Sequence, residues 1–252
     1  MNKVIDVKNL SFNFGVGELQ NKVLKNVNLC IHAGEMVIMT GPSGSGKTTF
    51  LTIIGGLRQA SLGSVTVVNK QLINSSEHTK IHIRQQIGCI FQQHNLLKSL
   101  TALQNVSMAL EFRYDFTERE RLNRSAEMLE LVGLGSRIHY KPDKLSGGQL
   151  QRVSIARALI GKPKIILADE LTASLDKKSG QEVVFLLKQL AKESCTAILL
   201  VTHDHRILNM AERIVELDDG IIKENKNINP DLLASGIEKY MKTCRETAYS
   251  KV

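Results

Sequence analysis

The sequence contains no tryptophan and only four tyrosines among its 252 residues. Aromatic side chains that could stack on the bases of single-stranded nucleic acid are therefore scarce. The four cysteines (Cys30, Cys89, Cys195 and Cys244) form no CxxC pair. This spacing argues against a zinc site or a disulfide framework and is typical of a reducing compartment. No apolar run approaches the roughly 18 residues that a membrane-spanning helix requires.

The overall composition is that of a soluble globular protein, with 42% hydrophobic and 23% charged residues. The N-terminal stretch MNKVIDVKNL carries an aspartate where a secretory signal would be apolar, so we expect no export signal. The formal net charge of +8 favours anionic partners such as nucleotides, nucleic acid or lipid headgroups. A solvated basic surface explains the same charge equally well.

Short β-type runs alternate with helical patterns, which predicts an α/β core with a largely parallel sheet. The N-terminal stretch and residues 65–68 indicate strands of a smaller antiparallel sheet. Residues 214–222 predict a hairpin around an Asp-Asp-Gly turn. The candidate buried strands of the main sheet are residues 36–40, 87–91, 165–168 and 197–201.

Residues 93–162 have mostly helical patterns and predict an inserted helical subdomain. Thr101 is followed three residues later by Gln104, a capping-box pattern that indicates the start of a helix. We expect the main domain to cover residues 1–225 and a C-terminal extension to cover residues 226–252. In that extension the side chains that could share one helix face are Leu232, Leu233 and Ile237.

Residues 41–49 read GPSGSGKTT, with a predicted strand before them and a helical pattern after them. The spacing of Gly41, Gly46, Lys47 and Thr48 fits the phosphate-binding loop G-x-x-x-x-G-K-[ST]. Glycines let successive backbone N–H groups turn inward around an anion, and the following helix adds its positive N-terminal end. We expect Lys47 to reach the β- and γ-phosphates of a nucleotide and the Thr48 hydroxyl to ligate Mg²⁺.

Asp169 and Glu170 follow four apolar residues, at the C-terminal end of a predicted strand. Sheets of the α/β class bind their ligands at this edge. We expect Asp169 to hold Mg²⁺ directly or through water, and Glu170 to orient and deprotonate an attacking water. Taken alone, both carboxylates could instead cap the following turn; the phosphate loop upstream favours the catalytic interpretation.

Residues 145–152 read LSGGQLQR and resemble the signature of ATP-binding-cassette (ABC) ATPases. Further elements of that family follow in the expected order. Gln92 in IFQQHNLL is similar to the Q-loop glutamine, and His203 in VTHD is similar to the switch histidine. The stretch Ser174-Leu175-Asp176 is similar to the D-loop.

Near the N-terminus, Phe14 is similar to the family's aromatic residue that stacks on adenine, with Phe12 as the rival candidate. The resemblance covers about residues 3–225. It implies a P-loop NTPase fold: a RecA-like α/β core with an antiparallel β subdomain and an inserted helical subdomain. The implied cofactors are ATP and Mg²⁺.

In the family, two ATP molecules lie between two chains arranged head to tail. The phosphate loop of one chain and the signature of the other together form each site. The resemblance implies catalytic roles for Glu170, His203 and Gln92, and it implies that Asp176 signals across the dimer. The implied metal ligands are Thr48, Gln92 and Asp169. The implied nucleotide-binding residues are Phe14, Gly41, Pro42, Ser43, Gly44, Ser45, Gly46, Lys47, Thr48, Thr49, Ser146, Gly147, Gly148, Gln149 and Asp176.

The finer resemblance is to the MacB/LolD/DevA-type branch, and the stretches FQQHNLL and NVSMAL are similar to DevA-like members. That branch implies an ATPase that is a homodimer in its ATP-bound state. It acts at the inner face of the cytoplasmic membrane with integral membrane permease subunits, often joined by a periplasmic adaptor. Its cargoes are macrolides, lipoproteins or glycolipids, and no nucleic acid is expected.

Two other functions stay open at this point. One is a regulatory module whose ATP-driven dimerisation signals through a membrane partner without moving cargo. The other is a soluble ABC protein that acts on nucleic acid or in cluster assembly. Most proteins of the second kind carry tandem cassettes, long insertions or coiled coils, and this sequence has none of these.

The sequence departs from the family pattern at Leu171, where a proline usually follows the glutamate. Leucine frees the backbone of the preceding residue and adds an N–H group. We expect a modest change in hydrolysis rate. In the stretch that joins the core to the helical part, Leu96, Leu97 and Leu100 could line the groove that receives a permease helix in the family, or could belong to the core.

Overall fold

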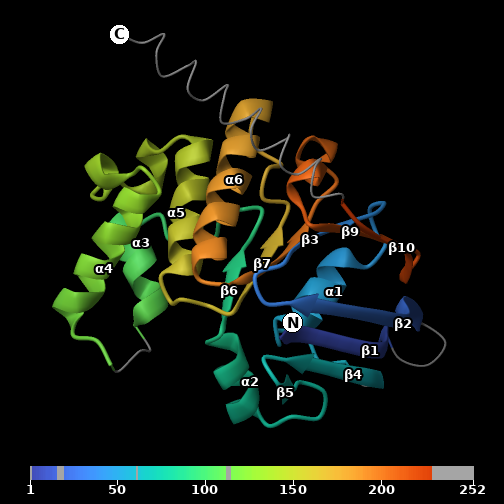
Figure 1. Cartoon of the computed structure of the whole chain (residues 1–252). Helices are drawn as coiled ribbons and strands as arrows, with labels where there is room; N and C mark the ends of the chain where they lie inside the picture. Colours follow the sequence, from blue (N-terminus) through green and yellow to red (C-terminus); the bar gives the residue numbers. More distant parts are fainter. Residues whose placement is uncertain (1, 16–19, 61, 112–114, 229–252) are drawn as a thin grey trace.

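The computed structural model of the chain describes residues 2–15, 20–60, 62–111 and 115–228 (Figure 1). At its centre is a six-stranded sheet whose neighbouring strands are all parallel except β10, which pairs antiparallel with β9. The strands, in spatial order, are β10 (Ile221–Asn227), β9 (Arg213–Asp218), β3 (Met36–Thr40), β8 (Ala197–Val201), β7 (Ile165–Asp169) and β6 (Ile87–Ile90). The predicted parallel sheet and the predicted hairpin are both confirmed.

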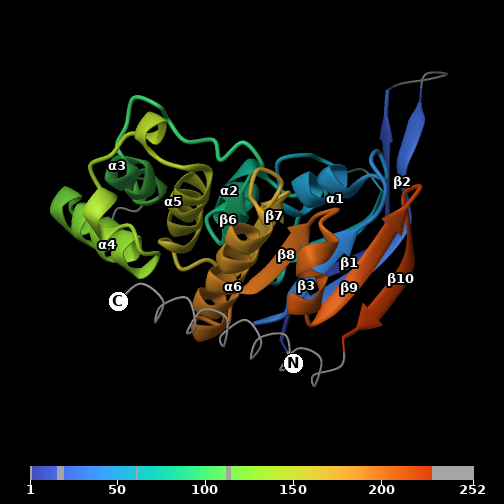
Figure 2. The ribbon, with the colours of Figure 1, turned by 90° about the horizontal axis from the view of Figure 1, so that it is seen from above.

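Both faces of this sheet are buried, which is why its strands read as continuous apolar runs. In β3, Met36 and Ile38 belong to one hydrophobic cluster, whereas Val37 and Met39 belong to the other. This alternation follows from the two-residue period of a strand. Seen from above, α6 (Lys177–Glu193) lies on one face of the sheet and α1 (Lys47–Ile54) lies on the other (Figure 2).

The second sheet has four strands, and it packs beside α1 with its apolar side chains in the second cluster. All of its neighbouring pairs are antiparallel. Its strands, in spatial order, are β2 (Asn21–His32), β1 (Lys3–Phe14), β4 (Leu62–Val67) and β5 (Lys70–Gln71). The antiparallel sheet expected from the N-terminal stretch is confirmed.

Helices between β6 and β7 form a layer beside the core, and α2 (Glu77–Arg84) precedes β6 (Figure 1). At the predicted capping box, the Thr101 hydroxyl accepts a hydrogen bond from the Gln104 N–H, and the Gln104 side chain accepts one from the Thr101 N–H (3.2 and 2.9 Å). The helices and short 3₁₀ turns of this part are α3 (Ala102–Ser107), η2 (Met108–Leu110), α4 (Glu118–Leu131), η3 (Gly135–Arg137), η4 (Pro142–Lys144) and α5 (Gly147–Leu159).

At the C-terminal side, η5 (His205–Met210) precedes β9, and β10 continues to Asn227. The helix face expected around residues 232–237 lies outside the described residues, so it stays a prediction. None of the helices in the described ranges is long and apolar enough to cross a lipid bilayer.

The register of the main sheet places four loops at one edge. Met39 and Asp169 both lie opposite Val201, and Ile90 lies opposite Ala168. Because these strands are parallel, their C-terminal ends coincide. The loops that follow β3, β6, β7 and β8 therefore meet where the sequence predicts the phosphate loop, Gln92, the two carboxylates and His203.

Candidate active site

The predicted phosphate loop, residues 41–49, joins β3 to α1. Its backbone requires glycine at two positions. Gly41 has a φ of +140°, and a Cβ at this position would collide with the Leu217 carbonyl. Gly46 has a φ of +102°, and a Cβ there would lie 2.9 Å from Leu24 Cδ2. The loop is therefore packed closely onto the core, while its outer residues Pro42, Ser43 and Gly44 are exposed. α1 begins at Lys47, so its free N–H groups face the same space.

The Lys47 side chain is buried inside this loop. Its ammonium donates to the Gly41 carbonyl (2.9 Å), the Pro42 carbonyl (2.8 Å) and the Ser45 hydroxyl (3.3 Å). Burial lowers the pKa of Lys47, and the nearby carboxylates of Glu170 and Asp169 act in the opposite direction. The loop thus holds a positive charge at its centre, and the free N–H groups at the start of α1 belong to the same loop end. This combination suits a phosphate group.

Thr48 and Asp169 meet across the junction between α1 and β7. The Thr48 hydroxyl donates a hydrogen bond to Asp169 Oδ2 (3.1 Å). Burial raises the pKa of Asp169 above its ordinary value, and the hydrogen bond from Thr48 opposes this shift. This hydroxyl–carboxylate pair supplies the oxygen ligands that Mg²⁺ prefers. Within the described residues there is no group of three or more His, Cys, Asp or Glu side chains that could hold a metal ion. A metal here would therefore need further oxygens from a bound phosphate.

Glu170 and His203 form a hydrogen-bonded pair at the same edge. Glu170 Oε1 lies 2.8 Å from His203 Nδ1, and Glu170 Oε2 is buried with no hydrogen-bond partner among the described residues. The Glu170 backbone has a φ of +52° and its N–H donates to the Val201 carbonyl (2.9 Å). One carboxylate oxygen is thus oriented by the histidine, and the other is left as a free acceptor.

Asp204 joins the loop of His203 to the loop of Glu170, and the sequence patterns gave no hint of this role. Its carboxylate accepts hydrogen bonds from the Thr172 hydroxyl (2.8 Å) and from Arg206 Nε and Nη2 (2.7 Å each). The hydrogen bond from Arg206 is the main reason that the pKa of Asp204 is well below its ordinary value. Asp204 directly follows His203 in the stretch VTHD, but no local pattern pairs it with Thr172, which is 32 residues away.

The signature residues form the N-terminal end of α5. The Ser146 hydroxyl accepts from the Gln149 N–H (3.4 Å), and the Gln149 side chain accepts from the Ser146 N–H (3.0 Å). Gly147 approaches Leu175, whereas a Cβ on Gly148 would meet nothing within 4 Å. The Ser146 hydroxyl proton and the first N–H groups of α5 therefore remain available for an anion from outside.

The signature and the phosphate loop belong to two separate cavities. Ser146, Gly148 and Gln149 line one cavity of about 360 Å³ together with residues of α6. Thr48 and Thr49 line another of about 340 Å³, and the two cavities have no residue in common. Within the described residues, the signature and the phosphate loop therefore line different cavities of the same chain.

The order and placement of these elements agree with the comparison to known families, in which residues 24–173 match the family described as ABC transporter. The chain belongs to the ABC transporter family. It is 44% identical over 230 residues to the uncharacterized ABC transporter ATP-binding protein MJ0796 of Methanocaldococcus jannaschii, and the match covers 89% of this chain and 97% of that protein.

A second relative of this ABC protein is the macrolide export ATP-binding/permease protein MacB of Photorhabdus laumondii subsp. laumondii. It is 44% identical over 224 residues, which cover 88% of this chain and 34% of MacB. The chain thus spans about a third of the length of that relative.

Two solved structures show the same fold. The dimeric post-hydrolysis state of the cassette MJ0796 bound to ADP and Pi has a TM-score of 0.82 at 41% identity and covers 89% of this chain and 99% of that one. CbiO1 from Clostridium perfringens, part of an ABC transporter complex, has a TM-score of 0.81 at 27% identity and covers 96% and 93%. The expected fold class and the resemblance to MacB-type ATP-binding proteins are confirmed.

Phe14 ends β1 and is half-exposed, and it lines the cavity of the phosphate loop. Its rival Phe12 packs against the hydrophobic core instead. An exposed ring beside the phosphate loop favours Phe14 as the adenine platform in this ABC protein, although this assignment stays a prediction.

Gln92 lies on the turn after β6, at the same edge as Asp169 and Glu170. Its side chain is exposed and makes no hydrogen bond to the phosphate loop or to either carboxylate within the described ranges. Its metal-binding and catalytic roles therefore stay predictions. In the following segment, Leu96 packs against the core and Leu97 is exposed. Leu96 thus fits the core interpretation, and a role of Leu97 in a permease groove stays a prediction.

Asp176 is the N-cap of α6. Its side chain accepts hydrogen bonds from the Lys178 and Ser179 N–H groups (3.0 and 3.1 Å), and the hydrogen bonds from Ser179 lower its pKa. The residue thus has a structural role within one chain. Its signalling role across a dimer stays a prediction of the family resemblance.

Proposed function

We propose that this ABC protein hydrolyses ATP as a homodimer and thereby drives the export or extraction of a hydrophobic or amphipathic cargo through separate permease subunits. A lipid, glycolipid, lipoprotein or macrolide-like molecule is the cargo class. The MacB relative is a macrolide export protein, and this supports export as the direction of transport. The pairing of Glu170 with His203 beside the phosphate loop carries the hydrolytic part of the proposal.

In this mechanism the phosphate loop binds the nucleotide through its backbone N–H groups and Lys47. Thr48 and Asp169 are placed to hold Mg²⁺, which would neutralise phosphate charge as the bond to the γ-phosphate breaks. Glu170 Oε2 accepts the proton of the attacking water, and His203 Nδ1 fixes the orientation of that carboxylate through Oε1. Asp204 keeps the two loops together.

The separation of the signature from the phosphate loop of the same chain supports the proposed dimer. The signature end of α5 offers a hydroxyl and N–H groups but lines a different cavity from the phosphate loop of its own chain. In a head-to-tail dimer it meets the γ-phosphate on the partner, so bound ATP joins the two chains and hydrolysis releases them. The dimeric cassette bound to ADP and Pi supports this arrangement.

The expected partners are integral membrane permease subunits, which would hold the ATPase at the inner face of the cytoplasmic membrane. The proposal also includes a periplasmic adaptor protein that binds the permease. CbiO1 is part of an ABC transporter complex, and this supports a permease partner for the present chain. The competing proposal is a regulatory module that binds a membrane partner in response to ATP without moving cargo.

The test is purification of tagged Glu170→Gln protein from solubilised native membranes with and without ATP–Mg²⁺, with Lys47→Ala as the matched control that lacks phosphate binding. Co-purification of a permease only with ATP, followed by ATP-dependent cargo movement in vesicles containing that permease, supports the proposal. ATP-dependent partner binding without cargo movement would favour the regulatory module. Recovery of nucleic acid, with a steep salt dependence of binding, would favour a soluble ABC function.

A further inference from the structure

We propose that Arg58 is a positioning residue that holds Phe14 as the stacking platform for the adenine base. This inference deepens the proposed ATP-binding function and rests on it. Arg58 lies in the turn that follows α1, which is 44 residues from Phe14 in the sequence. No motif of the sequence marks it.

The guanidinium of Arg58 covers one face of the Phe14 ring. Its Cζ atom lies 4.6 Å from the ring centroid of Phe14 and 5.6 Å from that of Phe12. The two rings meet edge to face, with centroids 5.0 Å apart and planes at 89°. Arginine over an aromatic face within about 6 Å is an attractive cation–π contact. Phe14 is thus held by a cation on its face and by a second ring at an angle of about 90°.

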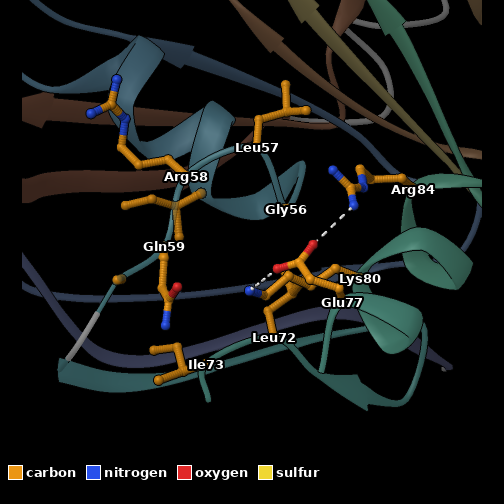
Figure 3. A pocket seen from close by; sticks show the side chains of 11 residues that line it. Gly56, Leu57, Arg58, Gln59, Leu72, Ile73, Glu77, Lys80 and Arg84 are labelled. Atoms are coloured by element: carbon orange, nitrogen blue, oxygen red, sulfur yellow. Dashed lines mark hydrogen bonds and ion pairs between the residues drawn. The ribbon is translucent and has the colours of Figure 1, made fainter. Parts of the chain in front are cut away.

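Arg58 does not form an ion pair with the acidic residue of the neighbouring pocket. Figure 3 shows this pocket, whose acidic side chain Glu77 pairs with Lys80 (2.8 Å) and Arg84 (3.5 Å). The Arg58 side chain points away from Glu77 in the same view (Figure 3). Across the described part of the chain, Arg58 takes part in no ion pair. Its contact with the two phenylalanine rings is therefore its main interaction.

Phe14 also faces the cavity of the phosphate loop, which Arg58 does not line. We therefore assign one face of the ring to the guanidinium and the other face to a base that enters from the cavity. Phe14 is the last residue of β1 and is 39% exposed, and the ring contacts that the described residues make with it are those of Arg58 and Phe12. A platform fixed before binding costs less ordering when the base arrives.

The test compares Arg58→Ala and Arg58→Lys with the matched control Arg84→Ala. Arg84 lines the same pocket but pairs with the Glu77 carboxylate and not with an aromatic ring. Arg58→Ala should raise the KM for ATP about threefold with kcat unchanged, as expected from a modest cation–π contact. Arg58→Lys should restore most of the affinity because an ammonium also attracts the ring face. Arg84→Ala should leave KM unchanged.

Two further readouts separate positioning from a structural or general electrostatic role. Inhibition by tripolyphosphate, which has no base, should be the same in native protein and Arg58→Ala. In a Phe14→Ala background, Arg58→Ala should have no additional effect on KM. Weaker tripolyphosphate inhibition, an additive effect, or tighter ATP binding by Arg58→Ala would overturn the inference. Failure of the native protein to bind ATP would overturn the proposed function as well, whereas native ATP binding that Arg58→Ala leaves unaltered would overturn this inference alone.

Discussion

Glu170→Gln separates ATP binding from ATP hydrolysis in this site. Glutamine keeps the shape of the side chain and can keep a hydrogen bond to His203, which is 2.8 Å from Glu170 Oε1. It cannot accept the proton of an attacking water at the position of Oε2, the buried oxygen that has no partner among the described residues. A positioned general base contributes about 10²–10⁴-fold to a rate. We therefore expect ATP hydrolysis to fall by about that factor, or about 3–5 kcal/mol of barrier.

The assay measures phosphate release under ATP saturation and, separately, ATP binding by the fluorescence of a labelled nucleotide. Binding should stay within about threefold of native, because no phosphate-loop group is altered. Glu224→Gln, which alters an exposed glutamate that pairs with Lys226 on β10, is the matched control and should hydrolyse ATP at the native rate. Hydrolysis by Glu170→Gln within twofold of native would refute Glu170 as the base. Loss of ATP binding would show that Glu170 shapes the pocket instead.

Three further predictions concern neighbours of this carboxylate. Asp169→Asn should abolish most hydrolysis yet raise the melting temperature at neutral pH. Burial raises the pKa of Asp169, so the charged carboxylate destabilises the fold at any pH above that pKa. The gain in melting temperature should vanish in acid, where the native aspartate is protonated. Asp204→Asn should lower the melting temperature at neutral pH, because Arg206 lowers the pKa of Asp204 and so stabilises its charged form. The difference in melting temperature between native protein and variant should shrink as the pH falls. An equal difference at pH 3 and pH 7 would contradict this. Leu171→Pro should alter the hydrolysis rate by less than about tenfold, since the Leu171 N–H makes no hydrogen bond within the described residues, and a hundredfold change in a steady-state assay would show a larger role.

Much of this site could be predicted because its chemistry is carried by short local motifs. The phosphate loop and the Asp169–Glu170 pair each follow a buried apolar run, and the parallel register then brings these runs to one edge. Strands β3 and β8 begin and end at the predicted residues because their apolar stretches are short and sharply bounded. The capping box at Thr101 is likewise a local pattern with a local physical cause.

The remaining features depend on contacts between distant segments. The hydrogen bond between Thr172 and Asp204 and the contact of Arg58 with Phe14 join residues that no periodicity relates. The left-handed backbone of Glu170 was also unpredictable, because positive φ is uncommon at residues other than glycine. Tertiary packing, not propensity, selects such conformations. A local sequence pattern cannot supply these contacts or this backbone geometry.

The most direct test of the central claim, that the signature acts on ATP bound by another chain, is the mass in solution of Glu170→Gln protein with ATP–Mg²⁺ and with ADP. We expect a dimer with ATP and a monomer with ADP. Ser146→Arg in the same background should stay a monomer with ATP while each chain still binds ATP, because Ser146 lies outside the cavity of its own phosphate loop. An ATP-dependent dimer that survives Ser146→Arg, or loss of ATP binding by the single chain, would contradict the shared site.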